Sequence, residues 1–284
     1  MQNRFFSDAM INVLARSDAW TFVTSWFPAD IAPVNDTRHA AWMAQHTHEH
    51  QHVEIVVTLC GGGLQGVDGR IYHRRPGSIF IFDSLTKHDY YFPAWTPSEE
   101  QLWISILDTH VVYSMISTQG EKDELRTIWR RDLNSEDFGG LNLRLPAEQT
   151  AAPAARLLCI GCMGGLLGAI VHAGYQANDT DSPDQFQQRI VHSVQQHICR
   201  RAGKGVTLES MAHFAGYSKY HFHRLFKQYA GMTVHEYIDQ CREEKIRELR
   251  SAGASQKAIA DALGFSGIPA YLHWVRRLRQ RRHE

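Results

Sequence analysis

The stretch at residues 216–231, GYSKYHFHRLFKQYAG, decides how we expect the last third of this 284-residue chain to fold. Its apolar side chains recur at the i, i+3, i+4, i+7 spacing of one helix face; they are Phe222, Leu225, Phe226 and Tyr229. The rest of the helix is polar and mostly basic, and we expect it to project outward: Tyr220, His221, His223, Arg224, Lys227 and Gln228. Such a helix is either simply solvated or presents its basic face to a polyanion.

The pattern around this helix occurs twice, which predicts a repeated helix-turn-helix. TLESMAHFAGYS at 207–218 matches SQKAIADALGFS at 255–266 with a constant offset of 48 residues. Each copy predicts a helix that starts at a capping residue, a close helix contact at alanine, a glycine turn and a second helix that starts at serine. The paired positions are Thr207 and Ser255, Ala212 and Ala260, Gly216 and Gly264, and Ser218 and Ser266.

The segment between the two copies is expected to be one rigid helix. Residues 234–250 (VHEYIDQCREEKIRELR) are 17 residues without Gly or Pro. A helix of that length measures roughly 25 Å at about 1.5 Å per residue. A spacer of this order can hold two recognition helices about one turn of duplex DNA, ~34 Å, apart on one face of the duplex.

The charge distribution also favours a polyanionic partner for the C-terminal part. The chain has 30 basic and 30 acidic residues, but residues 185–284 hold 17 of the basic and 8 of the acidic ones, a net charge of +9. The remainder therefore carries −9. A neutral chain divided in this way suggests one part that meets DNA and one part that does not.

At these residues the chain resembles the AraC/XylS family of bacterial transcription regulators. The run GYSKYHFHRLFKQYAGMTVHEYI (216–238) is similar to the family's first recognition helix and linker-helix start. The resemblance implies two helix-turn-helix units joined by a long helix, with base contacts from Tyr220, His223 and Arg224. Arginine can make two hydrogen bonds to guanine, tyrosine can pack on a thymine methyl, and lysine suits phosphates. The residues expected to bind DNA in this unit are Ser218, Lys219, Tyr220, His221, His223, Arg224, Lys227 and Gln228.

The second unit departs from the family pattern. Residues 267–273 read GIPAYLH, so that His273 stands where the family usually has arginine. Pro269 is acceptable in the first turn of a helix, where its missing N–H is not needed. We expect mainly sequence-independent phosphate contacts here, unless the terminal arginine run is a solvated tail. The residues expected to contact DNA are Ser266, His273, Arg276 and Arg277.

The N-terminal part is expected to be a β-sandwich or a small β-barrel with flanking helices, which makes the chain an α+β protein. Four short segments are rich in β-branched and aromatic residues and are separated by Gly and Pro turns. They are Val53–Cys60, 70–73, Ser78–Phe82 and 102–107. The predicted organisation is a barrel at 1–150, a helical segment at 151–173, a linker at 174–185 and the DNA-binding domain at 186–284.

The run QHTHEHQHVEIVVTLCGGG contains His48, His50, Glu54 and Gly61 at the spacing of the first cupin motif, and Pro76-Gly77 with His88 resembles the second. This resemblance implies a cupin barrel that binds a small-molecule effector. We expect His48, His50 and Glu54 to lie on one face of a strand. With His88 they could hold a divalent metal, or they could hydrogen-bond an organic effector without one. Frequent aromatic residues (Trp20, Phe22, Trp26, Trp42, Tyr90, Tyr91, Trp95 and Trp103) are expected to divide between core and pocket.

Residues 150–172 predict one or two helices, interrupted or softened by Pro153 and several glycines. This apolar segment is either a homodimer contact or a helix packed on the barrel. Its Cys159 and Cys162 share a face, and we expect buried thiols there rather than a metal or redox site. Five cysteines without a signal sequence indicate a cytoplasmic protein without a disulfide framework and without membrane association,.

These observations predict a transcription regulator rather than an enzyme, controlled by an effector in the barrel. Effector binding would change the geometry of a homodimer, the affinity for promoter DNA or the recruitment of RNA polymerase. One alternative is a metal-dependent dioxygenase or isomerase built on His48, His50, Glu54 and His88, with the helical part serving only to target DNA. Another is an architectural DNA-binding protein that senses nothing.

Overall fold

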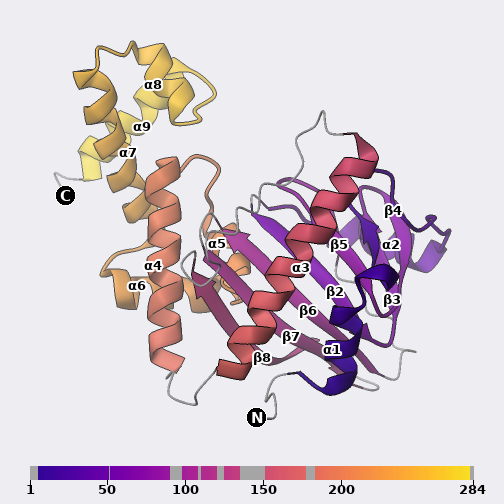
Figure 1. Cartoon of the computed structure of the whole chain (residues 1–284). Coiled ribbons are helices and arrows are strands. Elements are labelled where there is room, and N and C mark those ends of the chain that lie inside the picture. The colour runs from indigo at the N-terminus through magenta and orange to yellow at the C-terminus, as the bar shows by residue number, and fades with distance from the viewer. Residues whose placement is uncertain are drawn as a thin grey trace. The chain divides into compact units, whose positions relative to one another are not determined.

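The computed structural model describes residues 6–50, 52–89, 98–107, 110–119, 125–134, 151–176 and 183–281 (Figure 1). The chain forms two compact units, residues 1–181 and 182–284. The first contains every strand that the structure describes, and the described part of the second is entirely helical. The chain is thus a protein of mixed helices and strands, with a large sheet in its N-terminal unit and a helical C-terminal unit.

The strands of the N-terminal unit form one large sheet and one small one. The six-stranded sheet has the order β1-β5-β2-β6-β7-β8, and β3 pairs with β4 in a separate hairpin. β1 is parallel to β5, and the other neighbours are antiparallel. The strands are β1 (Thr21–Val23), β2 (Val53–Cys60), β3 (Gly63–Val67), β4 (Arg70–Arg74), β5 (Ser78–Phe82), β6 (Ser98–Leu107), β7 (His110–Gln119) and β8 (Leu125–Asn134).

The large sheet is open, so the expected closed barrel is not confirmed. In the described residues β1 and β8 are the two edges of the sheet and do not pair with each other. The β3–β4 hairpin pairs only within itself, apart from isolated bridges such as the one between Val67 and His88. A barrel requires every strand to pair on both sides, and these strands do not meet that condition.

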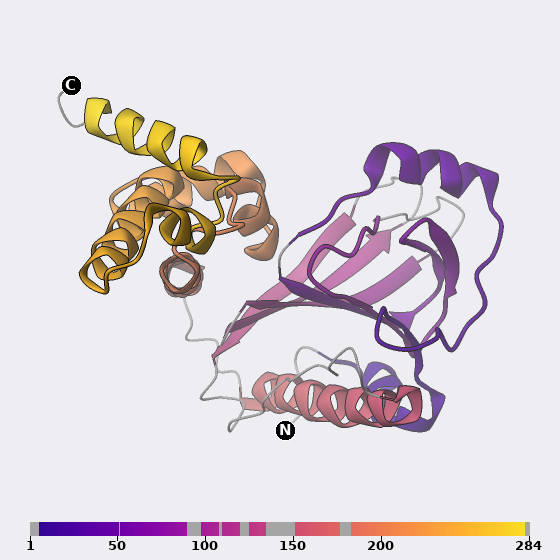
Figure 2. The ribbon, with the colours of Figure 1, turned by 90° about the horizontal axis from the view of Figure 1, so that it is seen from above.

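Both faces of the large sheet are covered, which explains why β2 is an almost continuous apolar run. Ile55, Val57 and Leu59 belong to a core shared with the helices α1 (Asp8–Ala15) and α3 (Ala152–Gln176). Val56 faces the opposite way and packs in a second cluster with side chains of β3, β4 and β5. Figure 2 shows α1 and α3 on one side of the sheet, while α2 (Thr37–His46) and the hairpin lie on the other.

The segment expected to be one or two helices is the single 25-residue helix α3, so the prediction of an interruption is wrong. Pro153 is its second residue, where proline is tolerated, and the glycines lie within a regular helix. The side chains that face the sheet recur every three or four positions: Ala155, Cys159, Met163, Leu166, Leu167 and Ile170. Burial raises the pKa of the Cys159 thiol to about 12.

Among the described residues, α3 also has the length and apolar composition that a membrane-spanning helix needs. Its sheet-facing side chains are part of the core, and this packing accounts for an apolar composition on that side without a bilayer. The opposite side carries Leu157 and Leu158, both exposed. α3 continues to Gln176 and α4 begins at Pro183, so both helices extend into the linker expected at 174–185; residues 177–182 lie outside the described part.

The C-terminal unit contains two helix-turn-helix pairs on either side of one long helix, as the repeat predicts. α5 and α6 form the first pair and α8 and α9 the second, and Figure 1 shows α7 between them. The bounds are α4 (Pro183–Arg201), α5 (Leu208–Phe214), α6 (Lys219–Ala230), α7 (Val234–Ser251), α8 (Gln256–Ala262) and α9 (Ile268–Arg281).

The local signals that predicted these helices are present in the structure. Thr207 and Ser255 accept hydrogen bonds from the backbone N–H groups three residues later, so both are helix caps,. Gly216 and Gly264 have φ values of 64° and 74°, a conformation that favours glycine,. Ala212 and Ala260 are buried at the contacts within each pair.

Leu263 tests the packing of the second pair. Its side chain is fully buried in a cluster with Ile259, Tyr271 and Trp274, so we expect Leu263→Ala to lower the free energy of unfolding of this unit by about 2–5 kcal/mol. Leu272→Ala is the matched control, because Leu272 is 37% exposed and its truncation should change stability by less than about 1 kcal/mol. Urea denaturation measures both; equal losses would contradict the assigned packing.

Candidate nucleic-acid interface and candidate effector site

α6 turns its apolar face inward and its basic face outward. Phe222, Leu225 and Phe226 are buried, and Tyr229 is half-buried. These side chains pack toward α4, α5 and α7. Ser218 caps the helix by accepting a hydrogen bond from the N–H of His221. The rotation of α6 about its axis is therefore determined by the burial of its apolar residues.

The residues expected to contact DNA lie on the outward face of α6. Tyr220 projects furthest into solvent among the large apolar side chains of this helix and is 82% exposed. His223 is half-buried, which makes it the least accessible of the expected set. The exposed members are Ser218, Lys219, Tyr220, His221, Arg224, Lys227 and Gln228.

Lys219 has a protein partner in the absence of DNA. Its ammonium group forms a close ion pair with Glu209 on α5. A hydrogen bond with Glu209 raises the pKa of Lys219, and the same contact lowers the pKa of Glu209. Both side chains are exposed, so solvent screening keeps this pair weak and a phosphate could compete with Glu209 for the ammonium group.

α9 is anchored to α7 by polar contacts that sequence reasoning missed. The Trp274 indole N–H donates to Asp239 Oδ1 at 2.8 Å, and Arg250 donates to the Tyr271 hydroxyl at 3.0 Å. The Arg242 guanidinium lies over the Phe265 ring, 5.0 Å from its centroid. Burial lowers the pKa of Arg242, an effect that nearby Asp239 opposes. The sequence signal for these contacts was that Asp239, Arg242 and Arg250 lie among apolar residues of α7.

This anchoring determines what α9 exposes. Pro269 is the second residue of α9, the position expected to tolerate it. Tyr271 and Trp274 are buried, and the intervening positions face solvent. The expected contact residues Ser266, His273, Arg276 and Arg277 are all exposed. In neither pair, therefore, is the expected DNA-facing side packed inside the unit.

In the N-terminal unit, the four residues predicted from the cupin pattern come together, but not on one strand. Only Glu54 belongs to β2, where it pairs with Phe82 of β5 and Ser105 of β6. His48 precedes the strand and forms an isolated bridge with His88, which follows β5. The expectation that His48, His50 and Glu54 share one strand face is therefore wrong; the chain bends between them and brings them together in three dimensions.

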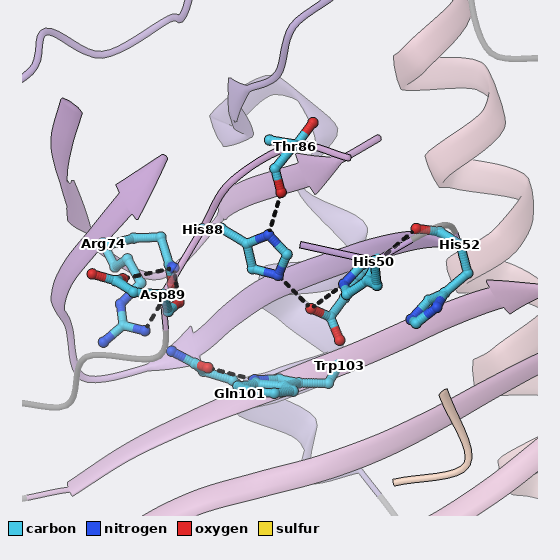
Figure 3. A network of polar contacts seen from close by, with 10 residues as sticks. His50, His52, Arg74, Thr86, His88, Asp89, Gln101 and Trp103 are labelled. Atoms are coloured by element: carbon cyan, nitrogen blue, oxygen red, sulfur yellow. Dashed lines mark hydrogen bonds and ion pairs between the residues drawn. The ribbon is translucent and has the colours of Figure 1, made fainter. Parts of the chain in front are cut away.

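The geometry of this cluster points three nitrogen atoms and a carboxylate toward one another. The ligand atoms of His48, His50 and Glu54 lie within 4.8 Å of one another. Glu54 Oε2 is 3.4 Å from His50 Nε2 and 3.2 Å from His88 Nε2 (Figure 3). The His48 and His88 rings are 4.3 Å apart between centroids. His50, Glu54 and His88 are buried and His48 is half-buried.

Backbone contacts orient two of these rings. His50 Nδ1 lies 2.9 Å from the His52 carbonyl oxygen, and His88 Nδ1 lies 2.8 Å from the Thr86 carbonyl oxygen. Because a carbonyl oxygen only accepts, each Nδ1 carries the hydrogen and donates it. In a neutral ring Nε2 then presents its lone pair to the Glu54 carboxylate. Lone pairs facing a carboxylate repel one another, and a cation placed among them would attract all three groups.

Neighbouring aromatic rings fix the histidines further. The Phe82 ring stacks on His88 at 4.0 Å, and His52 stacks on His50 at 3.8 Å. His46 instead stacks on Trp42 of α2 and is exposed, so it lies outside the cluster. The two histidines that crowd the motif in the sequence therefore differ: His52 supports the site and His46 does not.

A second buried polar network begins at Asp89, directly after His88. Asp89 Oδ2 is 2.7 Å from His39 Nε2, and its Oδ1 accepts from the Gly66 N–H at 2.9 Å. Arg74 Nη2 donates to Glu99 Oε2 at 2.9 Å (Figure 3 labels Arg74 and Asp89). Burial lowers the pKa of Arg74 and raises that of Glu99, and the attraction between them opposes both shifts.

A polar hollow of about 360 Å³ lies beside this network. Its lining comes from the start of α2, the β2–β3 turn and β4, and includes Asp36, His73 and Arg74. Of the aromatic residues expected in core or pocket, Trp20 and Phe22 are core, Trp42 is exposed, and Trp26 and Trp103 are half-buried. Tyr90, Tyr91 and Trp95 lie outside the described residues.

Comparison with known proteins identifies the C-terminal part. A family model described as a helix-turn-helix domain matches residues 211–281, which include most of α5 and all of α6 to α9. Residues 211–281 form an AraC-type helix-turn-helix domain. The resemblance seen at residues 216–238 is thereby confirmed. This match does not include residues 1–210, so the cupin resemblance of the N-terminal unit stays a prediction.

One curated relative is similar over a short stretch. The probable transcription factor PqrA of Proteus vulgaris is 36% identical over 64 residues, which are 22% of this chain and 52% of PqrA. The chain thus spans about half the length of PqrA. No solved structure is significantly similar to the chain.

Proposed function

We propose that this protein is a transcription regulator that binds specific DNA through its C-terminal unit and a small effector through its N-terminal unit. The observation that carries the first half is the exposed basic face of α6 within a helix-turn-helix domain. The similarity to a probable transcription factor supports it. One match is to a helix-turn-helix domain and the other to a probable transcription factor, which favours a regulator over the alternative of a metal-dependent enzyme.

In this proposal α6 lies in the major groove. Arg224 donates two hydrogen bonds to guanine, and Tyr220 packs on a thymine methyl group. Lys219 and Lys227 contact phosphates, Lys219 after leaving Glu209. The same face has four further polar residues that would contact the duplex: Ser218, His221, His223 and Gln228.

We expect Arg224→Ala to weaken discrimination between specific and random DNA by ~1–3 kcal/mol, because the two hydrogen bonds to guanine are lost. A duplex selected by the protein from a random pool provides the specific DNA, and titration by fluorescence anisotropy measures both affinities. Arg16→Ala, an exposed arginine of the N-terminal unit, is the control and should behave like the native chain. Unchanged discrimination in Arg224→Ala would show that α6 does not read bases in this way.

We propose that α9 contributes mainly affinity for phosphates. Ser266, His273, Arg276 and Arg277 are exposed, and only two of the four carry a permanent positive charge. The exposed apolar Leu272 on the same helix offers no hydrogen bond to a base edge.

Arg276→Ala combined with Arg277→Ala should make DNA binding less dependent on salt. Each phosphate contact contributes about −0.9 to the slope of log K against log salt, so the double variant should have a slope shallower by roughly 2. The preference for the selected sequence should persist. A slope equal to that of the native chain would mean that the arginines are solvated instead.

For the N-terminal unit we propose a divalent metal as part of effector binding. His48, His50, Glu54 and His88 would hold it, because three imidazoles and a carboxylate suit Zn²⁺, Fe²⁺ or Mn²⁺. The two Nε2 atoms directed at Glu54, with each Nδ1 held by a backbone carbonyl, match the orientation of metal-bound histidines,. The metal would supply a Lewis acid that an oxygen-bearing effector can reach. An organic effector without metal is the alternative use of the same residues.

His50→Ala and Glu54→Gln should each abolish binding of one divalent ion per chain, since each removes a ligand. Elemental analysis after dialysis against Mn²⁺ or Zn²⁺ measures the content, and the rise in melting temperature with added metal gives an independent readout. His46→Ala is the control, because His46 lies outside the cluster. A native chain that takes up no metal under these conditions would favour the organic effector.

Regulation further requires that effector binding reaches the DNA-binding unit. We propose a homodimer formed through the outward side of α3, where Leu157, Leu158 and Tyr175 are exposed. An added Cβ at Gly161, Gly164 or Gly168 would meet nothing within 4 Å, so a second helix can approach there. Sedimentation of the full chain tests the dimer, and a changed association constant with effector would link it to promoter binding and to RNA polymerase.

A further inference from the structure

Two cysteines of the C-terminal unit, on α4 and α7, lie together. Cys199 is near the end of α4 and Cys241 is in the middle of α7. Their Sγ atoms are 2.7 Å apart, and a disulfide joins sulfur atoms at about 2.05 Å. A movement of well under an ångström would therefore bring them to bonding distance.

The backbone holds the two helices at this short distance. A Cβ built on Gly203, which follows α4, would lie 2.5 Å from Ile238 Cγ2 on α7. No side chain fits between the chain there and α7, so the end of α4 rests directly on it. Arg242 of α7 donates to the Gly203 carbonyl oxygen at 3.5 Å. The approach of the sulfur atoms is thus a consequence of how α4 and α7 pack.

The two thiols have different surroundings, which suits different roles. Cys199 is exposed, and Cys241 is buried. Burial raises the pKa of the Cys241 thiol, and contact with Cys199 raises it further. The Tyr237 hydroxyl lies 3.4 Å from Cys199 Sγ and can donate a hydrogen bond to it. An oxidant in solution therefore reaches Cys199 first, while Cys241 remains a protonated thiol beside it.

We propose that Cys199 and Cys241 are an oxidation site that forms a reversible disulfide between α4 and α7 in response to a hydroperoxide. The Cys199 thiolate attacks the peroxide oxygen, giving a sulfenic acid and releasing an alcohol or water. The Cys241 sulfur then attacks the sulfenic sulfur, forming the S–S bond and releasing water. Overall, two thiols and one hydrogen peroxide give one disulfide and two waters. Thiol reductants reverse the reaction.

The bond would enclose the first helix-turn-helix unit. Cys199 and Cys241 are 42 positions apart, and the intervening chain contains α5 and α6. A cross-link over a loop of this length restricts the unfolded chain. Because little movement is needed to form it, the folded unit should accept the bond without distortion. Oxidation would therefore stabilise the DNA-binding unit and hold α6 in place on α4 and α7.

Peptide mapping of the full chain tests the bond. The protein is treated with hydrogen peroxide, remaining thiols are alkylated, and the digest is analysed by mass spectrometry. We expect a cross-linked peptide pair containing Cys199 and Cys241, lighter by two hydrogens and cleaved by dithiothreitol. It should be absent in Cys199→Ser and in Cys241→Ala and present in Cys60→Ser, since Cys60 is an exposed cysteine of the other unit. Cys199 appearing only as sulfinic or sulfonic acid, or linked to another cysteine, would overturn the proposal.

Thermal unfolding tests the consequence. The transition of the C-terminal unit should rise by about 10 °C or more after oxidation and return on reduction. Cys199→Ser should show no rise, and because Cys199 is exposed this variant should fold like the native chain. An intramolecular disulfide that forms without a rise in melting temperature would overturn the claim that the bond stabilises the first helix-turn-helix unit. Neither readout requires DNA, so failure here and failure of DNA binding are distinguishable.

Discussion

Burial of the apolar face of α6 is the constraint on which the proposed interface depends. Phe222 and Phe226 are one turn apart, and their packing leaves a single rotation for the helix,. Arg224 lies between these two positions and Tyr220 lies two residues before them, and both point away from the buried face and are exposed. α9 follows the same principle with Tyr271 and Trp274 inside. A helix without a fixed inner face could not present a defined set of side chains to a base sequence.

The two units use their charges in opposite ways. The C-terminal unit keeps most of its basic side chains at the surface, where they can meet phosphates,. The N-terminal unit instead buries Glu54, Arg74, Asp89 and Glu99. Buried charges are unfavourable unless they are paired. Apolar residues of similar volume would stabilise the fold about as well, so stability alone does not explain these charges. Their concentration around the histidine cluster is what a polar ligand site requires, and it supports the proposed sensing role.

Residue patterns within single segments predicted some strands of the N-terminal unit. They missed strands and helices whose formation depends on contacts with distant segments. β2 and β5 occupy the residues expected, because β-branched runs between turns signal buried strands,. β3 was missed because GLQGV contains two glycines and no alternation; its partner β4 completes it. α2 was missed because only His39 and Met43 of TRHAAWMAQH are buried, so the segment has no continuous apolar stripe. The closed barrel was expected by resemblance, and pairing between the edge strands, which would decide it, is encoded in no single segment.

The sequence by itself determined where α5, α6, α7 and α8 begin, how the two helix-turn-helix units repeat, and which face of α6 is basic. These features depend on spacing within about twenty residues, so they can be counted along the chain. Only the tertiary structure decided that Arg74 pairs with Glu99, that Trp274 donates to Asp239, and that Cys199 touches Cys241. Residues 25 to 42 positions apart come together through the packing of whole elements, and that packing leaves no periodic trace in the sequence.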